Sequence, residues 1–230
     1  MTVILDYIEQ GSDEWLQARL GRITMSNADK LLTGGKGVTR MSYIIDVASE
    51  IASGVPSEKV NTWEMARGTL LEPFARQAYE AHTGLKVKQV GLGYLDENRR
   101  ISASPDGLTI DGGMEIKCQG AKAHLRTIID AKNPKKFTPQ IQGSMWVFET
   151  ETWDYCSFCP EFKTMPLFVM RVNRDEEIIK QIQDSALKAV FEVDEYVKLA
   201  REEPNETINA ICNEAIELID IMQNKEVEIY

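Results

Sequence analysis

Two carboxylates and an amine interrupt a stretch of sequence that otherwise has the pattern of a sheet. In ISASPDGLTIDGGMEIKCQG, residues 101–120, Asp106 follows a Ser-Pro pair, and Glu115 and Lys117 alternate with apolar residues. Ser-Pro-Asp-Gly favours a tight turn, and the Asp-Gly-Gly that follows turns the chain back. Because successive side chains of a strand point to opposite faces, Glu115 and Lys117 share one face, and we expect Asp106 to lie close to Glu115 across the hairpin.

The chemistry of this group follows from its charges. Two carboxylates brought together repel each other unless a cation lies between them. The available ligands are oxygens, so Mg²⁺ or Mn²⁺ is the expected cation. With Lys117 to hold water or to face developing negative charge, the set suits phosphodiester hydrolysis by metal ions and an activated water. A structural interpretation stays open, in which Asp106 caps a turn and Glu115 and Lys117 pair on a solvated strand face.

Helical and strand-like segments alternate around this group. Apolar residues at three- and four-residue spacing predict helices over 11–21, 24–35, 41–54, 61–84, 121–131, 138–150 and from 174 onward. Alternating, Val- and Ile-rich segments predict a meander of strands over 85–118 and two more strands over 152–160 and 165–173. Pro73 kinks or restarts the fourth helix. This order predicts an α/β domain with a mixed sheet and helices on its faces.

Length and charge set the outer bounds. The chain of 230 residues is 43% hydrophobic and 27% charged, which suits a single domain over residues 1–230. The net charge of −10 is confined to the end of the chain: residues 175–230 carry 15 acidic and 5 basic side chains, and residues 1–174 are neutral. This split excludes a globally basic nucleic-acid binder but allows a local basic groove. With no apolar run of membrane-spanning length and no signal peptide, we expect a cytoplasmic protein without membrane attachment.

Several motifs together resemble a known nuclease family. SPDG followed by MEIKC resembles the PD-(D/E)xK nuclease motif. WLQARLGRITMSNADKLL, ARGTLLEPFARQAYE and PQIQGSMWV resemble, in the same order, segments of the lambda exonuclease family, also called the YqaJ-like viral recombinases. The similarity covers about residues 9–175 and leaves the acidic helical segment 175–230 outside. It implies a restriction-endonuclease-like fold, with a mixed central sheet flanked by helices.

The resemblance implies a role for each residue of the metal site. Asp106 would bridge two Mg²⁺ ions, for which Mn²⁺ may substitute. Glu115 and the backbone carbonyl of Ile116 would complete one of the two sites. Glu72 matches an upstream acidic ligand, and Lys117 would orient the nucleophilic water.

Further matches concern the DNA. Gln142 would lie beside the scissile phosphate with Gln140 as its companion, and Met65 matches an apolar wedge that helps unpair the DNA end. Family members degrade one strand of linear duplex DNA from its 5′ end and leave a 3′ overhang. They form ring-shaped trimers and act with a single-strand annealing protein in phage or prophage recombination.

A third set of matches concerns the terminal 5′-phosphate, which Arg19, Ser26 and Ser104 would hold. The residue types agree with this role. Ser26 with Asp29 three residues later predicts a helix N-cap, where free backbone amides favour an anion. The planar guanidinium of Arg19 suits a phosphate.

Two other functions remain open from the sequence. The first is an endonuclease or nickase with the same PD-(D/E)xK chemistry. The second is a scaffold that binds DNA ends or a recombinase without cutting, although the intact set of Asp106, Glu115 and Lys117 counts against it. Either would share the fold of an exonuclease.

Basic loops and cysteines complete the set of candidates. Side chains that could contact DNA phosphates are Lys36, Arg40, Lys132, Lys135 and Lys136. Some related nucleases hold an iron–sulfur cluster with four cysteines. This chain also has four cysteines, which are Cys118, Cys156, Cys159 and Cys212. Their spacing lacks the clustered set near the C-terminus that such a cluster uses, so we do not expect one.

Overall fold

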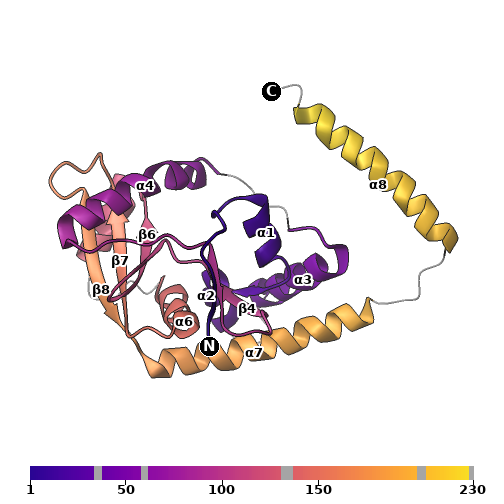
Figure 1. Cartoon of the computed structure of the whole chain (residues 1–230), viewed down its shortest axis with the longest axis horizontal. Helices are drawn as coiled ribbons and strands as arrows, with labels where there is room; N and C mark the ends of the chain where they lie inside the picture. The colour runs from indigo at the N-terminus through magenta and orange to yellow at the C-terminus, as the bar shows by residue number, and fades with distance from the viewer. Residues whose placement is uncertain (34–37, 58–61, 131–136, 201–205, 228–230) are drawn as a thin grey trace. The chain divides into compact units, whose positions relative to one another are not determined.

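Two four-stranded sheets and the helices around them form the first of two units in this computed structural model (Figure 1). That unit runs over Met1–Val197, and the second over Lys198–Tyr230. The structure describes residues 1–33, 38–57, 62–130, 137–200 and 206–227. Each sheet mixes parallel and antiparallel pairs, so the predicted α/β class with mixed pairing is confirmed.

The first sheet has the order β1-β3-β4-β2, and the second the order β5-β6-β7-β8. The strands of the first sheet are β1 (Val3–Leu5), β2 (Ile23–Thr24), β3 (Leu92–Tyr94) and β4 (Ile101–Ala103). Those of the second are β5 (Gly107–Thr109), β6 (Gly112–Lys117), β7 (Thr152–Phe158) and β8 (Leu167–Asn173). The meander expected over 85–118 is therefore divided between two sheets. The division falls at Pro105, which has no N–H to donate to a continuing ladder.

The helices follow the predicted order with changes at their ends. They are α1 (Asp13–Arg19), α2 (Ala28–Leu32), α3 (Val38–Ser53), α4 (Trp63–Thr83), α5 (Ala121–Ile129), α6 (Thr138–Phe148) and α7 (Glu176–Leu199). Helix α4 runs unbroken through Pro73, and left-handed Gly84 ends it. The predicted cap at Ser26 is wrong, because Met25–Asn27 forms a 3-10 turn and Asn27 precedes α2. The Ser26 hydroxyl instead contacts side chains, as described below.

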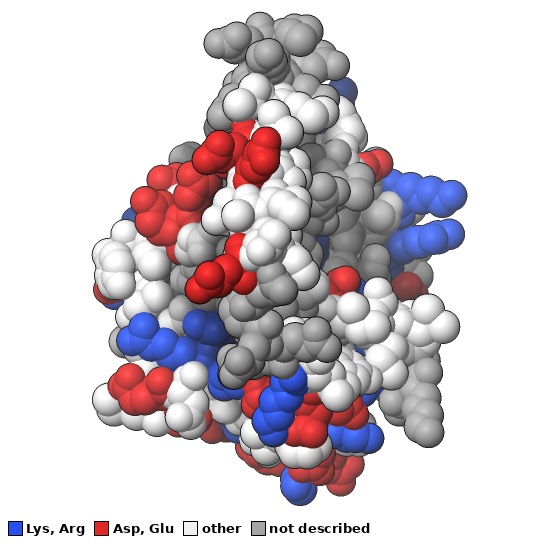
Figure 2. Space-filling model, turned by 90° about the vertical axis from the view of Figure 1, so that its right-hand side faces the viewer, with Lys and Arg blue, Asp and Glu red and all other residues white. Residues whose placement is uncertain are grey.

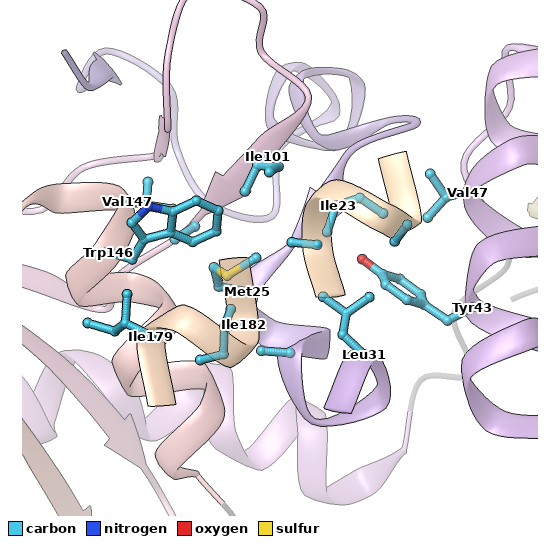
Figure 3. Close-up of a cluster of buried hydrophobic side chains, with 14 of the residues drawn as sticks. Ile23, Met25, Leu31, Tyr43, Val47, Ile101, Trp146, Val147, Ile179 and Ile182 are labelled. Atoms are coloured by element: carbon cyan, nitrogen blue, oxygen red, sulfur yellow. The ribbon is translucent and has the colours of Figure 1, made fainter. Parts of the chain in front are cut away.

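Helix α6 connects the two sheets through the main core. It contacts β3 and β4 of the first sheet and β6 and β7 of the second, and its residues from Ile141 to Phe148 are all buried. Figure 3 shows Met25 of the 3-10 turn between Trp146 of α6 and Ile182 of α7. Burial of this kind contributes about 1.5–3 kcal/mol for each large side chain. Residue 140, at the start of α6, is thereby held beside β6.

The second unit contains helix α8 (Glu206–Val227). All side chains described in it, from Glu206 to Met222, are exposed. Its acidic residues continue the excess of negative charge near the end of the chain. Figure 2 shows both basic and acidic side chains on the face of the molecule turned to the viewer. Among the described residues, no helix combines the length and hydropathy needed to cross a membrane.

Candidate active site

The hairpin of β5 and β6 brings Asp106 and Glu115 together, as the sequence predicts. Asp106 directly precedes β5, and its backbone N–H donates to the carbonyl of Met114 at 3.2 Å. Its carboxylate accepts a hydrogen bond from the N–H of Ile116 at 2.5 Å. Asp106 therefore lies across the strand from Glu115. On the opposite face of β6, Met114 and Ile116 are buried, so the alternation predicted for this strand is confirmed. They belong to a second apolar cluster, whose other buried members are Ala75, Tyr79, Cys156 and Phe158.

Glu115 is the most deeply buried acid of the group, with 2% of its surface exposed. One carboxylate oxygen accepts from Lys117 Nζ at 2.5 Å and from Gln140 Nε2 at 2.7 Å. The other oxygen, Oε2, is buried without a hydrogen-bond partner among the described residues. A buried carboxylate oxygen without a donor is costly, so this atom has an unmet need for a proton donor or a cation.

Burial and the repulsion between carboxylates act together on the acids of the site. Burial raises the pKa of Asp106 well above its usual value, and the carboxylates of Glu115 and Glu72 raise it further, while Lys117 opposes them. Burial alone would lower the pKa of Lys117, but Glu115 and Asp106 outweigh it and raise this pKa instead. The amine is therefore firmly charged, yet one ammonium does not compensate the acids around it. A second, stronger cation would relieve the repulsion.

The oxygens present fit a hard divalent cation. Asp106, Glu115 with its unpartnered Oε2, and the carbonyl of Ile116 are an oxygen-only set of the kind that Mg²⁺ prefers. Glu72 is close enough to raise the pKa of Asp106, but its carboxylate is paired with Arg76 one turn along α4. Within the described ranges, no three His, Cys, Asp or Glu side chains form a preassembled metal cluster.

The two glutamines of α6 make contacts with different parts of the fold. Gln140 contacts Glu115, whereas Gln142 Nε2 donates to the carbonyl of Asn173 at 2.9 Å. The Oε1 of Gln142 accepts from the N–H of Asp175, also at 2.9 Å. Residues two apart on a helix point to nearly opposite sides, so only one of the pair can reach β6. Gln142 thus links α6 to the end of β8 and to the residue before α7. Its role beside the scissile phosphate stays a prediction.

A second polar group lies around Arg19 at the end of α1. Its Nη1 donates to Ser104 Oγ at 3.0 Å and its Nη2 to Ser26 Oγ at 3.2 Å, so the three residues expected to hold a 5′-phosphate are together. The guanidinium lies 4.3 Å from the ring centre of Trp15, and the Trp15 indole N–H also donates to Ser104 at 3.1 Å. Burial lowers the pKa of Arg19. Arg19 and Arg22 line a cavity of about 250 Å³. The Nε of Arg22 is buried and has no hydrogen-bond partner among the described residues.

Ser104 links the two groups, because it lies two residues before Asp106 in the turn from β4 to β5. Met65, the expected wedge, is 47% exposed near the start of α4. It lies seven residues before Glu72, which is two helical turns, so both occupy the same side of α4. The sequence reasoning missed Trp15 and Arg76. Each lies four residues from a predicted site residue on the same helix, a spacing that could have indicated both.

Other sequence candidates have structural roles or lie outside the described residues. Arg40 is buried and donates to Glu192 of α7 at 2.6 Å, so it joins α3 to α7. Cys156 is buried in the second apolar cluster, and Cys159 Sγ donates to Glu161 at 3.3 Å. The lysines that fall outside the described residues are Lys36, Lys132, Lys135 and Lys136.

Comparisons with known proteins agree with this geometry. Residues 14–152 match the YqaJ-like viral recombinase domain. The crystal structure of an alkaline exonuclease, LHK-Exo, from Laribacter hongkongensis is 30% identical with a TM-score of 0.76, covering 82% of this chain and 96% of that one. A structure of LHK-Exo in complex with dAMP is 29% identical over the same shares, also with a TM-score of 0.76.

A phage related exonuclease from Haemophilus somnus 129PT shares the fold, with a TM-score of 0.62 at 15% identity, covering 78% of this chain and 96% of that one. Among curated proteins no match is found. The match over residues 14–152 spans more than half of the chain and includes both predicted carboxylates. The chain therefore belongs to the family of YqaJ-like viral recombinase domains.

Proposed function

We propose that this chain is a Mg²⁺-dependent 5′-to-3′ exonuclease that degrades one strand of linear double-stranded DNA and leaves a 3′ overhang. The observation that carries the proposal is the pair of Asp106 and the buried Glu115, with an oxygen of Glu115 that has no partner among the described residues and a charged Lys117 beside it. Its similarity to an alkaline exonuclease supports nuclease activity, and the dAMP complex of that relative supports a DNA nucleotide as ligand.

Each residue of the site has a definable part in phosphodiester hydrolysis. Asp106, Glu115 and the carbonyl of Ile116 would hold up to two Mg²⁺ ions, with Glu72 as a further ligand once it leaves Arg76. Bound there, the ions would supply Lewis-acid stabilisation of the negative charge on the phosphate. Lys117 keeps its proton and donates it in hydrogen bonds to the attacking water or a phosphate oxygen. Gln140, fixed on Glu115, takes the place beside the scissile phosphate that was expected of Gln142.

The polarity of the reaction follows from the group at Arg19. A forked guanidinium and two hydroxyl groups suit the dianion of a terminal 5′-phosphate. Because Ser104 precedes Asp106 by two residues, a phosphate held there would set which phosphodiester reaches the carboxylates. Positioning of this kind supplies a large part of catalysis. Met65, on the same side of α4 as Glu72, would separate the terminal base pairs.

The wider role that we propose is single-strand annealing recombination of a phage or prophage. The enzyme would act as a homotrimer on linear duplex with a 5′-phosphate and pass its 3′ overhang to a single-strand annealing protein. Membership of the viral recombinase family supports this setting.

A gel assay with linear and closed circular duplex, each with Mg²⁺ and with EDTA, tests the proposal. We expect loss of the linear DNA alone, and only with Mg²⁺. Cutting of closed circles would establish the endonuclease or nickase instead. A mobility shift without products under every condition would establish a non-cleaving scaffold that binds DNA ends.

A further inference from the structure

Trp63 is the most exposed aromatic side chain on the helix that carries Glu72. It is the first residue of α4, and 73% of its surface is exposed. The backbone that holds it is fixed, because the preceding Thr62 caps the helix by accepting from the N–H of Met65 at 3.2 Å. An indole exposed to this extent loses the contribution of burial, which for a side chain of this size is substantial. Its position therefore calls for a ligand that packs on an aromatic ring.

Arg67 supports the ring of Trp63 and connects it to the catalytic strand. The guanidinium lies 6.0 Å from the ring centre. It is itself held by hydrogen bonds, from Nη1 to the carbonyl of Cys118 at 2.7 Å and from Nη2 to both carboxylate oxygens of Glu161 at 2.7 and 2.8 Å. A planar cation fixed in this way orients an aromatic ring and stabilises it. Trp63 is thus a supported platform.

Through Arg67, this platform is connected to the end of the strand that carries Glu115 and Lys117. Cys118, which Arg67 contacts, directly follows Lys117 in β6. Arg67 therefore joins the ring of Trp63 to the backbone one residue beyond Lys117.

We propose that Trp63 stacks on an unpaired nucleobase of the DNA at the edge of the active site. The inference rests on the proposed function, since an exonuclease that acts on duplex ends has unpaired nucleotides next to its carboxylates. Every base presents a flat face, so an aromatic platform binds single strands with little dependence on sequence, and an arginine beside the ring adds to the attraction. Trp63 is a positioning residue here: it holds the strand and takes no part in the chemistry.

Leu70 provides the matched control. It lies on the same side of α4, seven residues after Trp63, and is 70% exposed. If the exposed side of α4 were an interface with another protein or another copy of the chain, Leu70 would contribute to it as Trp63 does. A base-stacking role predicts that only Trp63 matters.

The test measures DNA binding and cleavage on the same four proteins: wild type, Trp63→Ala, Trp63→Phe and Leu70→Ala. Binding is followed in EDTA, by fluorescence anisotropy, with a labelled twelve-nucleotide single strand and with a blunt hairpin duplex. Trp63→Ala should bind the single strand about tenfold or more weakly, with the blunt duplex much less affected. Trp63→Phe should restore most of the affinity, and Leu70→Ala should behave as wild type. The single strand should also quench tryptophan fluorescence in wild type and not in Trp63→Phe.

Equal single-strand affinity in Trp63→Ala and wild type overturns the inference. So does an equal loss in Leu70→Ala, or a change of mass by light scattering in Trp63→Ala, since either outcome assigns the surface to protein contacts. Cleavage of linear duplex with Mg²⁺ separates this result from the proposed function. If single strands quench the fluorescence of wild type but wild type cuts no DNA, the stacking role of Trp63 stands and the proposed exonuclease function is wrong. If wild type cuts linear duplex but single strands do not quench its fluorescence, the function stands and the stacking role is wrong.

Discussion

At the scale of single residues, the site is defined by negative charge that the protein alone does not neutralise. Asp106 and Glu115 are drawn together by the register of one hairpin, and Glu72 adds a third carboxylate in electrostatic reach. Lys117 offsets part of this repulsion through its contact with Glu115. Such an arrangement costs stability in the absence of a cation and gains it when one binds.

This balance predicts opposite effects of Asp106→Asn on stability and activity. The substitution removes one of the repelling charges, so in EDTA the unfolding temperature should stay the same or rise. Added Mg²⁺ or Mn²⁺ should stabilise wild type and not the variant, and cleavage should be lost. Thermal melting with and without metal, together with calorimetry of Mn²⁺ binding, checks this. Unchanged Mn²⁺ affinity in the variant would show that Asp106 is not a ligand.

The two glutamines of α6 predict a separable pair of effects. Gln140→Ala removes a donor to Glu115, so cleavage should fall by one to two orders of magnitude while the free energy of unfolding changes little. Gln142→Ala leaves the carbonyl of Asn173 and the N–H of Asp175 without partners, so the free energy of unfolding should fall by about 1–3 kcal/mol. Urea unfolding and cleavage rates, measured on both variants, test these two expectations. If Gln142→Ala slowed cleavage more than Gln140→Ala does, without a change in stability, Gln142 and not Gln140 would be the residue that acts at the site.

The central residues could be predicted from the sequence because they depend on local rules. Strand alternation and one tight turn are enough to bring Asp106, Glu115 and Lys117 together. The choice between Gln140 and Gln142 depends on which side of α6 faces β6, and helix periodicity alone does not tell the two sides apart. The pairing of Glu72 with Arg76 is local, but its closeness to Asp106 is set by the packing of α4.

At the scale of elements, the buried carboxylate of Asp154 holds α4 against the second sheet. Asp154 of β7 accepts from Arg171 of β8, at 2.9 Å from Nε and 3.0 Å from Nη2, and from the hydroxyl of Tyr79 of α4 at 2.6 Å. Burial alone would raise the pKa of Asp154, but these hydrogen bonds outweigh it and hold the pKa below its usual value. The three contacts fix the helix that carries Glu72 relative to the strands beside Glu115.

Asp154→Asn should therefore lower the free energy of unfolding by about 1–3 kcal/mol at neutral pH. Because the folded pKa of Asp154 is depressed, its contribution is present above the unfolded pKa near 4 and is lost as pH falls through the folded pKa. The difference between variant and wild type should shrink below about pH 4. Asp184→Asn, in an exposed pair with Lys180, is the control and should cost under about 0.5 kcal/mol. If both variants lowered the free energy of unfolding by the same amount, Asp154 would not have this structural role.

The helices and strands could be predicted from the sequence where neighbouring residues determine them. The caps at Ser12 and Gly84 and the amphipathic helices follow from residue type and spacing. The division of the strand meander between two sheets does not, since it depends on pairing between β4 and β2 far apart in the chain. The cap at Ser26 failed because its hydroxyl is taken by Arg19 and Thr24.

At the scale of the whole molecule, the acidic end of the chain divides in two. Helix α7 belongs to the main core through the buried Ile179, Ile182, Ala186, Ala189 and Val193. The first unit therefore extends to Val197, beyond the boundary near residue 175 that the resemblance indicates. Helix α8 buries none of its described side chains. The acidic residues beyond Val197 belong to the second unit.

A chain ending at Ala200 should fold and cut DNA as the full chain does. Since no described side chain of α8 is buried, the unfolding temperature should change by less than about 2 °C. If the protein is a trimer of 26.0 kDa chains, light scattering should give three copies for both forms. If the shortened chain no longer cuts DNA, or no longer forms the trimer that the full chain forms, α8 contributes to the working enzyme.

The most direct test of the account is the fate of each strand of one linear duplex. One end carries a 5′-phosphate and the other a 5′-hydroxyl, and each strand has its own fluorophore at the 3′ terminus. With Mg²⁺, the phosphorylated strand should shorten from its 5′ side about 10- to 100-fold faster than the other, because charge-assisted contacts at Arg19 contribute about 1.5–3 kcal/mol. Arg19→Ala should remove most of this preference, and Asp106→Asn should stop both reactions. Early loss of the 3′ fluorophores, or equal shortening of both strands by wild type, would contradict it.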